Sequence, residues 1–299
     1  MNILIVGFGK MGKSHFRSFV NSKKKYQIFL YDKKFNKKKK YSYNKKEITE
    51  FNTFPKNKKF DLVIISTNAN VRLKILTQLV KNNKFKFLLL EKFLFLKLND
   101  YKIATKIISK YHLKVFVNVW GKIIFKPLKN KLKNKLIKKI TIICKKGELL
   151  TNLIHYYDFL SSAINSSSTN LIINKNYKLI KAKRKSYQEL DAELINNAIP
   201  LIKINTKEKI KYHLFNIETE KNQFSIKINY SGICYYYLNN KLFKKTTFPY
   251  AYLTTEKYFL HDYNSTKLKY FLNVNQVFSL SLEILRILKK YVKQKVIFT

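Results

Sequence analysis

The pattern of apolar and polar residues divides the chain into two parts. In the first 118 residues, short apolar runs alternate with segments of helical spacing. This alternation predicts parallel strands joined by helices. The predicted strands are Asn2–Val6, Gln27–Tyr31, Asp61–Ser66, Phe87–Leu90 and Lys114–Asn118. The predicted helical segments are Lys13–Asn21, a short piece at Lys46–Phe51, Asn70–Val80 and Asn99–Tyr111.

The second part follows another pattern. Lys126–Lys139 is basic without a clear period, whereas Lys139–Cys144 is typical of a strand and Glu148–Ile164 of an amphipathic helix. Further strands are predicted at Leu171–Ile173, Leu201–Ile204, Tyr212–Ile217, Phe224–Tyr230 and Ile233–Leu238, and a last helix at Val277–Tyr291.

These patterns predict an α/β protein of two domains. Residues 1–118 would form a Rossmann domain with a doubly wound parallel sheet. Residues 119–299 would form an α+β domain with a mostly antiparallel sheet, for substrate binding and dimerisation. The C-terminal helix, 277–291, could pack back on the first domain.

The turn after the first predicted strand is rich in glycine. Three of the six glycines of the chain lie here, in G-x-G-x-x-G spacing before a helix. Such a turn lets the backbone approach a pyrophosphate, which then faces the N–H groups of the helix start. The predicted cofactor-binding residues of this turn are Gly7, Phe8, Gly9, Lys10, Met11 and Gly12.

Asp32 follows the second predicted strand, 20 residues after Gly12. A carboxylate at this place accepts hydrogen bonds from the ribose hydroxyls and repels a 2′-phosphate, so it favours NAD. Lys33 and Lys34 come next and would tolerate a phosphate, so NADP is not excluded. The alternative is an ordinary turn aspartate.

The net charge of +44 calls for an explanation. One is a nucleic-acid or polyanion binder. The other is a coding bias, because only four of the 61 basic residues are arginine and the lysines are spread along the chain. Arginine is the residue that reads bases best, so we favour the bias and expect no specific nucleic-acid binding.

Other classes of protein find little support in the sequence. Cys144 and Cys234 are far apart, which predicts no disulfide framework and no metal site. No stretch reaches the about 18 uncharged apolar residues of a membrane span. We therefore expect a cytoplasmic protein without membrane contact.

Polar residues follow two further strands at their carboxyl ends, where ligands bind in parallel sheets. Ser66, Thr67 and Asn68 end the third strand, and we expect them to contact the cofactor, although an ordinary capped turn would look the same. Glu91 and Lys92 end the fourth strand. A lysine in a cleft beside a nicotinamide can exchange a proton with a substrate hydroxyl.

Together, Gly7–Gly12, Ser66–Asn70, Glu91-Lys92 and a later helix with His155 and Asp158 resemble the glucose–fructose oxidoreductase/inositol dehydrogenase (Gfo/Idh/MocA) family. The details are most similar to members of surface-glycan or nucleotide-sugar pathways. The resemblance implies that Lys92 is the catalytic group and that Glu91 contacts the cofactor. It also implies a catalytic or substrate-binding role for His155.

At the junction of the domains the resemblance implies further substrate contacts. They are Asn118, Trp120 and Lys122, with Asn152 on the later helix. Trp120 could stack on a sugar ring, or it could belong to the core. His155 could likewise be a histidine bonded in the domain interface. Asp158 is expected to be structural.

The chain departs from the family pattern at three places. Phe93 follows Glu91-Lys92 where the family usually has proline. Thr151 stands where the family often has an aspartate four residues before the histidine, and only Gly147 remains of a glycine pair. A complete Lys–Asp–His relay is therefore not predicted.

The sequence predicts an NAD(P)-dependent oxidoreductase that transfers hydride between the cofactor and a hydroxyl or keto group of a sugar, sugar nucleotide or polyol. A homo-oligomer is expected. The alternatives are related redox-assisted glycoside cleavage, a dinucleotide-binding protein without catalysis, and a nonspecific polyanion binder driven by charge.

Overall fold

The computed structural model describes residues 1–166, 169–174, 176–182, 187–263 and 271–291. The chain divides into two compact units. Unit 1 comprises Met1–Val119 and Tyr250–Phe278, and unit 2 comprises Trp120–Pro249 and Ser279–Thr299. The chain therefore returns to unit 1 late in the sequence.

Unit 1 is built on an eight-stranded sheet of order β18-β7-β6-β5-β1-β2-β4-β3. The six inner strands are parallel, and β3 and β18 are antiparallel edges. The strands are β1 (Asn2–Val6), β2 (Gln27–Tyr31), β3 (Lys39–Tyr43), β4 (Lys46–Phe51), β5 (Lys58–Ile65), β6 (Asn83–Glu91), β7 (Lys114–Asn118) and β18 (Leu272–Asn273). The helices are α1 (Lys10–Val20), α2 (Ala69–Asn82), α3 (Leu98–Lys110) and α6 (Ala251–Tyr263).

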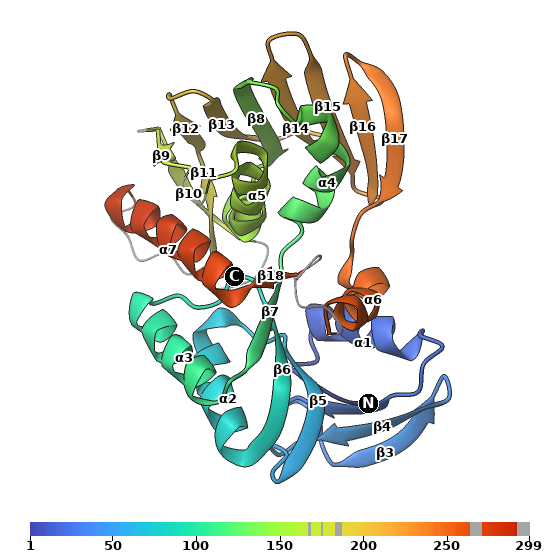
Figure 1. Ribbon diagram of the computed structural model, residues 1–299. Coiled ribbons are helices and arrows are strands. Elements are labelled where there is room, and N and C mark those ends of the chain that lie inside the picture. The colour runs from blue at the N-terminus through green and yellow to red at the C-terminus, as the bar shows by residue number, and fades with distance from the viewer. Residues whose placement is uncertain (167–168, 175, 183–186, 264–270, 292–299) are drawn as a thin grey trace. The chain divides into compact units, whose positions relative to one another are not determined.

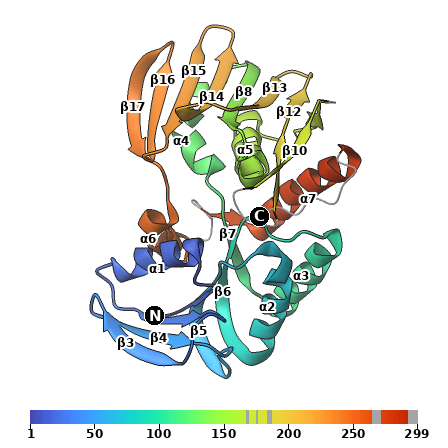
Figure 2. The same ribbon diagram turned by 180° about the vertical axis from the view of Figure 1, so that it is seen from behind.

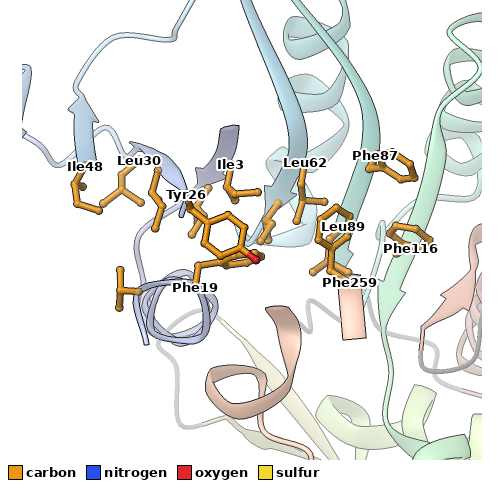
Figure 3. Close-up of a cluster of buried hydrophobic side chains, with 14 of the residues drawn as sticks. Ile3, Phe19, Tyr26, Leu30, Ile48, Leu62, Phe87, Leu89, Phe116 and Phe259 are labelled. Atoms are coloured by element: carbon orange, nitrogen blue, oxygen red, sulfur yellow. The ribbon is translucent and has the colours of Figure 1, made fainter. Parts of the chain in front are cut away.

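Helices cover both faces of this sheet, with α1 and α6 on one face and α2 and α3 on the other (Figure 1). Figure 3 shows Leu30, Leu62 and Leu89 of the strands beside Phe19 of α1 and Phe259 of α6, all of them fully buried. Burying such a side chain stabilises the fold by about 1.5–3 kcal/mol. The late helix α6 is thus part of the core of unit 1.

Unit 2 contains an eight-stranded sheet of order β17-β16-β15-β14-β8-β13-β12-β9 and a separate pair, β10 with β11 (Figure 2). All neighbours in the larger sheet are antiparallel except β8 and β13. The strands are β8 (Ile137–Lys145), β9 (Ile172–Ile173), β10 (Lys178–Lys181), β11 (Gln188–Asp191), β12 (Glu193–Asn196), β13 (Leu201–Lys207), β14 (Tyr212–Thr219), β15 (Gln223–Asn229), β16 (Ile233–Leu238) and β17 (Lys241–Thr247).

Two helices pack on one face of the larger sheet, α4 (Gly121–Leu132) and α5 (Leu149–Ile164). Phe159 of α5 lies 4.7 Å from Phe215 of β14, measured between ring centroids. The last helix, α7 (Val274–Tyr291), begins in unit 1 and continues in unit 2. The predicted fold class, a parallel Rossmann sheet followed by a mostly antiparallel sheet, is confirmed.

Two local predictions were wrong. Lys46–Phe51 is not helical but forms β4, which pairs with β2 and buries Ile48 and Phe51. A six-residue segment gains more from hydrogen bonds to a strand on each side, here β2 and β3, than from a short helix. The region of Lys126–Lys139 was predicted without a period, yet it contains most of α4. Its lysines surround a buried stripe, namely Ile124, Phe125, Leu128 and Leu132.

Candidate active site

The glycine turn connects β1 with α1. Gly7 has a φ of +91°, a conformation that residues with a Cβ rarely adopt. A Cβ on Gly12 would lie 1.9 Å from the carbonyl oxygen of Gly7, so only glycine fits there. A Cβ on Gly9 would meet no atom within 4 Å, which leaves its backbone open to a ligand. A dinucleotide pyrophosphate fits this turn.

The other side chains of the turn differ in exposure. Phe8 is half-buried, with its ring 5.5 Å from that of Phe16 and 5.7 Å from that of Phe35. Lys10 is exposed at the start of α1 and Met11 is half-buried.

Asp32 closes the turn from the end of β2. Its Oδ2 accepts a hydrogen bond from the N–H of Phe8 at 2.6 Å, and its Oδ1 accepts one from the N–H of Lys34 at 2.9 Å. The side chain is half-buried. Each carboxylate oxygen has a second lone pair, so both can still accept a bond from a ribose hydroxyl.

The segment after β5 packs directly on the glycine turn. Ser66 Oγ donates to the carbonyl oxygen of Gly7 at 2.7 Å. Thr67 Oγ1 is buried and has no hydrogen-bond partner among the residues that the structure describes. A buried hydroxyl without a partner is costly, so this atom suits a polar ligand group. Asn68 is the exposed residue before α2.

Glu91 ends β6 and is 4% exposed. Its Oε1 is bonded to Nε2 of His15 at 2.7 Å and to Nδ2 of Asn118 at 2.8 Å. Burial raises the pKa of Glu91, but the bonds from His15 and Asn118 and the charge of Lys92 outweigh it, so the pKa is lowered. The ionised carboxylate can only accept, so both neighbours donate to it.

Lys92 follows as a half-buried residue, and the peptide bond from Lys92 to Phe93 is cis. Asn118 ends β7, which is the neighbour of β6. The structure thus brings the predicted unit 1 residues together at the carboxyl ends of the parallel strands β1, β2, β5, β6 and β7. This edge is where ligands bind in such sheets.

In unit 2 the predicted residues gather around α5. His155 is 3% exposed, and its ring stacks on that of Trp120 with centroids 4.3 Å apart and an interplanar angle of 21°. His155 Nδ1 accepts from the N–H of Trp120 at 3.3 Å, which places the proton of a neutral ring on Nε2. Trp120 also contacts the rings of Phe215 and Phe248, so it belongs to an aromatic cluster within unit 2.

Asp158 lies one helical turn after His155. Its Oδ2 accepts from the N–H of Lys122 at 2.6 Å, whereas the Lys122 side chain is half-buried. Burial raises the pKa of Asp158 to about 7, although this bond and the charge of Lys122 lower it. A Cβ on Gly121 would lie 2.2 Å from the carbonyl oxygen of His155, so glycine is needed where α4 crosses α5.

Glu189 is a residue that the sequence analysis did not identify. It lies in β11, is 1% exposed, and accepts from the N–H groups of Leu150 at 2.8 Å and Thr151 at 3.0 Å. The hydroxyl of Thr151 donates to it as well. Thr151 therefore joins a carboxylate from another element to the first turn of α5, while the neighbouring Asn152 is half-buried. No local pattern links residues 151 and 189.

The described residues contain no helix that is long and apolar enough to cross a membrane. Within the same part of the chain, no three His, Cys, Asp or Glu side chains gather to hold a metal ion.

Residues 1–119 match the model of the Gfo/Idh/MocA oxidoreductase family, which is described by its NAD-binding Rossmann fold. No curated protein matches the chain with significance.

Solved structures resemble almost the whole chain. A super-repressor mutant of Gal80p from Saccharomyces cerevisiae has a TM-score of 0.69 at 14% identity, covering 98% of this chain and 96% of that one. UDP-N-acetylglucosamine 3-dehydrogenase GnnA from Acidithiobacillus ferrooxidans has a TM-score of 0.65 at 11% identity, covering 97% of this chain and 98% of that one. The WlbA dehydrogenase from Bordetella pertussis, solved with NADH and UDP-GlcNAcA, has a TM-score of 0.63 at 12% identity, covering 99% of this chain and 97% of that one. At such low identities, these TM-scores show a shared fold alone.

Proposed function

We propose that the chain is an NAD(P)-dependent oxidoreductase acting on a sugar, sugar nucleotide or polyol, because its residues 1–119 match the model of the Gfo/Idh/MocA oxidoreductase family. The observation that carries this proposal is the glycine turn, open at Gly9 and closed by Asp32, at the same edge of the parallel sheet as Glu91 and Lys92. The two similar dehydrogenases named above support a sugar nucleotide as substrate, since one is a UDP-N-acetylglucosamine 3-dehydrogenase and the other was solved with UDP-GlcNAcA.

In this proposal each residue has a defined task. The backbone at Gly9 and the start of α1 bind the pyrophosphate, while Asp32 binds the ribose and favours NAD. The bound nicotinamide supplies hydride acceptance and donation. In its uncharged form Lys92 takes the proton of the substrate hydroxyl as it becomes a carbonyl, and in its charged form it gives the proton back in the reverse direction. His155 binds the substrate through Nε2–H.

Fluorescence titration with NADH and NADPH tests the cofactor, and absence of binding to both would contradict the proposal. A screen of nucleotide sugars and polyols with NAD and NADP, followed by the absorbance of the reduced cofactor, tests the reaction. Lys92→Gln should lower turnover about 10²–10⁴-fold while NADH still binds. Lys106→Gln, at an exposed site on α3, is the matched control.

A dinucleotide-binding protein without catalysis is the second candidate. It is favoured by Thr151, which bonds Glu189 where the family often has an aspartate. The likeness to a super-repressor mutant of Gal80p agrees with it. NADH binding without turnover on any compound of the screen would support this candidate. Tight, base-specific oligonucleotide binding at physiological salt would instead favour the nucleic-acid alternative.

We also propose that the protein forms a homo-oligomer through the sheet of unit 2. Ile142 and Phe215 are fully buried on the helix-covered face, whereas their neighbours Ile143 and Leu214 point the other way and are half-buried. Apolar side chains on that face favour association. Light scattering at micromolar concentration tests this, and a monomer would contradict it.

A further inference from the structure

A buried arginine holds the loop that follows β6. Arg72 lies in α2 and is 2% exposed. Its Nη1 donates to the carbonyl oxygens of Glu91 at 2.7 Å and Leu94 at 2.9 Å, and also to that of Phe93. Its Nη2 donates to the carbonyl oxygen of Thr67 at 2.6 Å. One guanidinium therefore joins the loop carrying Lys92 to the loop after β5.

The charge of Arg72 strengthens this connection. Burial lowers the pKa of Arg72 to about 10, against the raising effect of Glu91, so the group is charged at neutral pH. A buried cation is costly unless hydrogen bonds compensate it, and here backbone carbonyls do so. Because the guanidinium is a rigid planar fork, its acceptors must stay in fixed directions.

His15 holds the same loop from the other side. It lies in α1, the helix that begins at the glycine turn, and it is fully buried. Nε2 donates to Glu91, and Nδ1 lies 2.8 Å from the hydroxyl of Thr255 in α6. This hydroxyl in turn donates to the carbonyl oxygen of Ala251. His15 thus connects the cofactor-binding helix, the end of β6 and the late helix of unit 1.

We propose that His15 and Arg72 are positioning residues that fix Lys92 relative to the glycine turn. Both residues next to Lys92 are held: Glu91 at its side chain and its carbonyl, and Phe93 at its carbonyl. Displacement of a reacting group by about 1 Å can cost about 10²-fold in rate, so such fixation matters for proton transfer. The catalytic meaning rests on the role proposed for Lys92, but the fixation itself can be measured without a substrate.

The test is acetylation of the native full-length protein with acetic anhydride, quantified at each lysine by mass spectrometry. Lys106 on α3 is exposed and serves as the internal reference. In Arg72→Lys the charge remains but the fork is lost. We expect labelling of Lys92 relative to Lys106 to rise on the order of tenfold. Arg17→Lys, at an exposed arginine of α1, should leave the ratio unchanged.

His15 provides a test of the hydrogen bond itself. His15→Gln keeps a side-chain donor, so labelling of Lys92 should stay within about twofold of the wild type. His15→Leu removes the donor and should raise it on the order of tenfold. His112→Gln, at an exposed histidine, is the control. Equal labelling in the Gln and Leu proteins would contradict the role of His15 as a donor.

Cooperative thermal unfolding identifies the variants that fold. If Arg72→Lys does not fold, the proposal is tested by the labelling of Lys92 in the His15→Gln and His15→Leu proteins alone. Unchanged labelling of Lys92 in folded Arg72→Lys and His15→Leu proteins would overturn the proposal. NADH binding is measured on the same samples. Absence of NADH binding to the wild type would contradict the proposed function but not the fixation of Lys92, so the two failures can be told apart.

Discussion

Unit 1 buries the carboxylate of Glu91 and unit 2 buries that of Asp158, yet the pKa values of the two groups are shifted in opposite directions. Glu91 accepts hydrogen bonds from His15 and Asn118 and lies near the charge of Lys92, and its pKa is lowered. Asp158 accepts from the backbone N–H of Lys122, and burial raises its pKa to about 7. Burial raises the pKa of both carboxylates, and the donors and charges around each one decide the net direction of the shift.

The largest effect should follow from removing the carboxylate of unit 1. Glu91→Leu leaves His15 and Arg72 buried without their anion. Breaking a buried pair on one side costs about 3–5 kcal/mol of unfolding free energy. Urea denaturation measures this. Glu91→Gln, which still accepts from Asn118, should lose less, and a larger loss in Glu91→Gln would contradict the ionised state of Glu91.

Asp158 should show the opposite dependence on pH. Its pKa is about 7 in the folded protein and about 3.9 when unfolded, so the folded state binds more protons between these values. The unfolding free energy therefore falls as pH rises from about 4 to about 7, by about 3 kcal/mol.

Asp158→Asn removes this titration and keeps an acceptor for Lys122. We expect the variant to be more stable than the wild type at about pH 8, and the difference to shrink toward about pH 5. Urea denaturation at several pH values measures the difference. A variant that is less stable at about pH 8 would show that Asp158 is stabilising as an anion, like Glu91.

How far the sequence could predict these two regions also differs. In unit 1, Gly7, Asp32 and Glu91 each follow a predicted strand, so parallel strands alone bring them to one edge. In unit 2, the contact between His155 and Trp120 depends on the crossing of α4 and α5. The sequence offered no period for α4, because lysines surround its apolar stripe.

The partners that fix the candidate residues were harder to predict than the residues themselves. Arg72 donates to backbone carbonyls, and every residue has a backbone carbonyl, so the sequence does not indicate which ones it binds. Thr255 reaches His15 because residues 250–278 return to unit 1. Long-range contacts of this kind depend on tertiary packing, and local periodicity does not encode them.

The two close approaches of glycine allow a comparison of packing in both units. Gly12→Ala would place a Cβ 1.9 Å from Gly7 O, and Gly121→Ala would place one 2.2 Å from His155 O. Each contact involves backbone, so each should cost about 1–3 kcal/mol in thermal or urea unfolding. Gly9→Ala meets no atom within 4 Å and should keep its stability while it weakens NADH binding. Loss of stability in Gly9→Ala would contradict the assignment of an open backbone there.

The smallest effect concerns the carboxylate at the start of α5. Glu189 accepts from the N–H groups of Leu150 and Thr151, which have no partner within the helix, and so it acts as a cap supplied by β11. Glu189→Gln keeps one acceptor oxygen and should cost about 1 kcal/mol in urea denaturation. Glu193→Gln, in β12, the next strand along the chain, is half-buried and serves as the matched control, which should cost less. If Glu189→Gln instead stabilised the protein, Glu189 would carry an uncompensated charge like Asp158, and both of these buried carboxylates of unit 2 would then differ from Glu91 in unit 1.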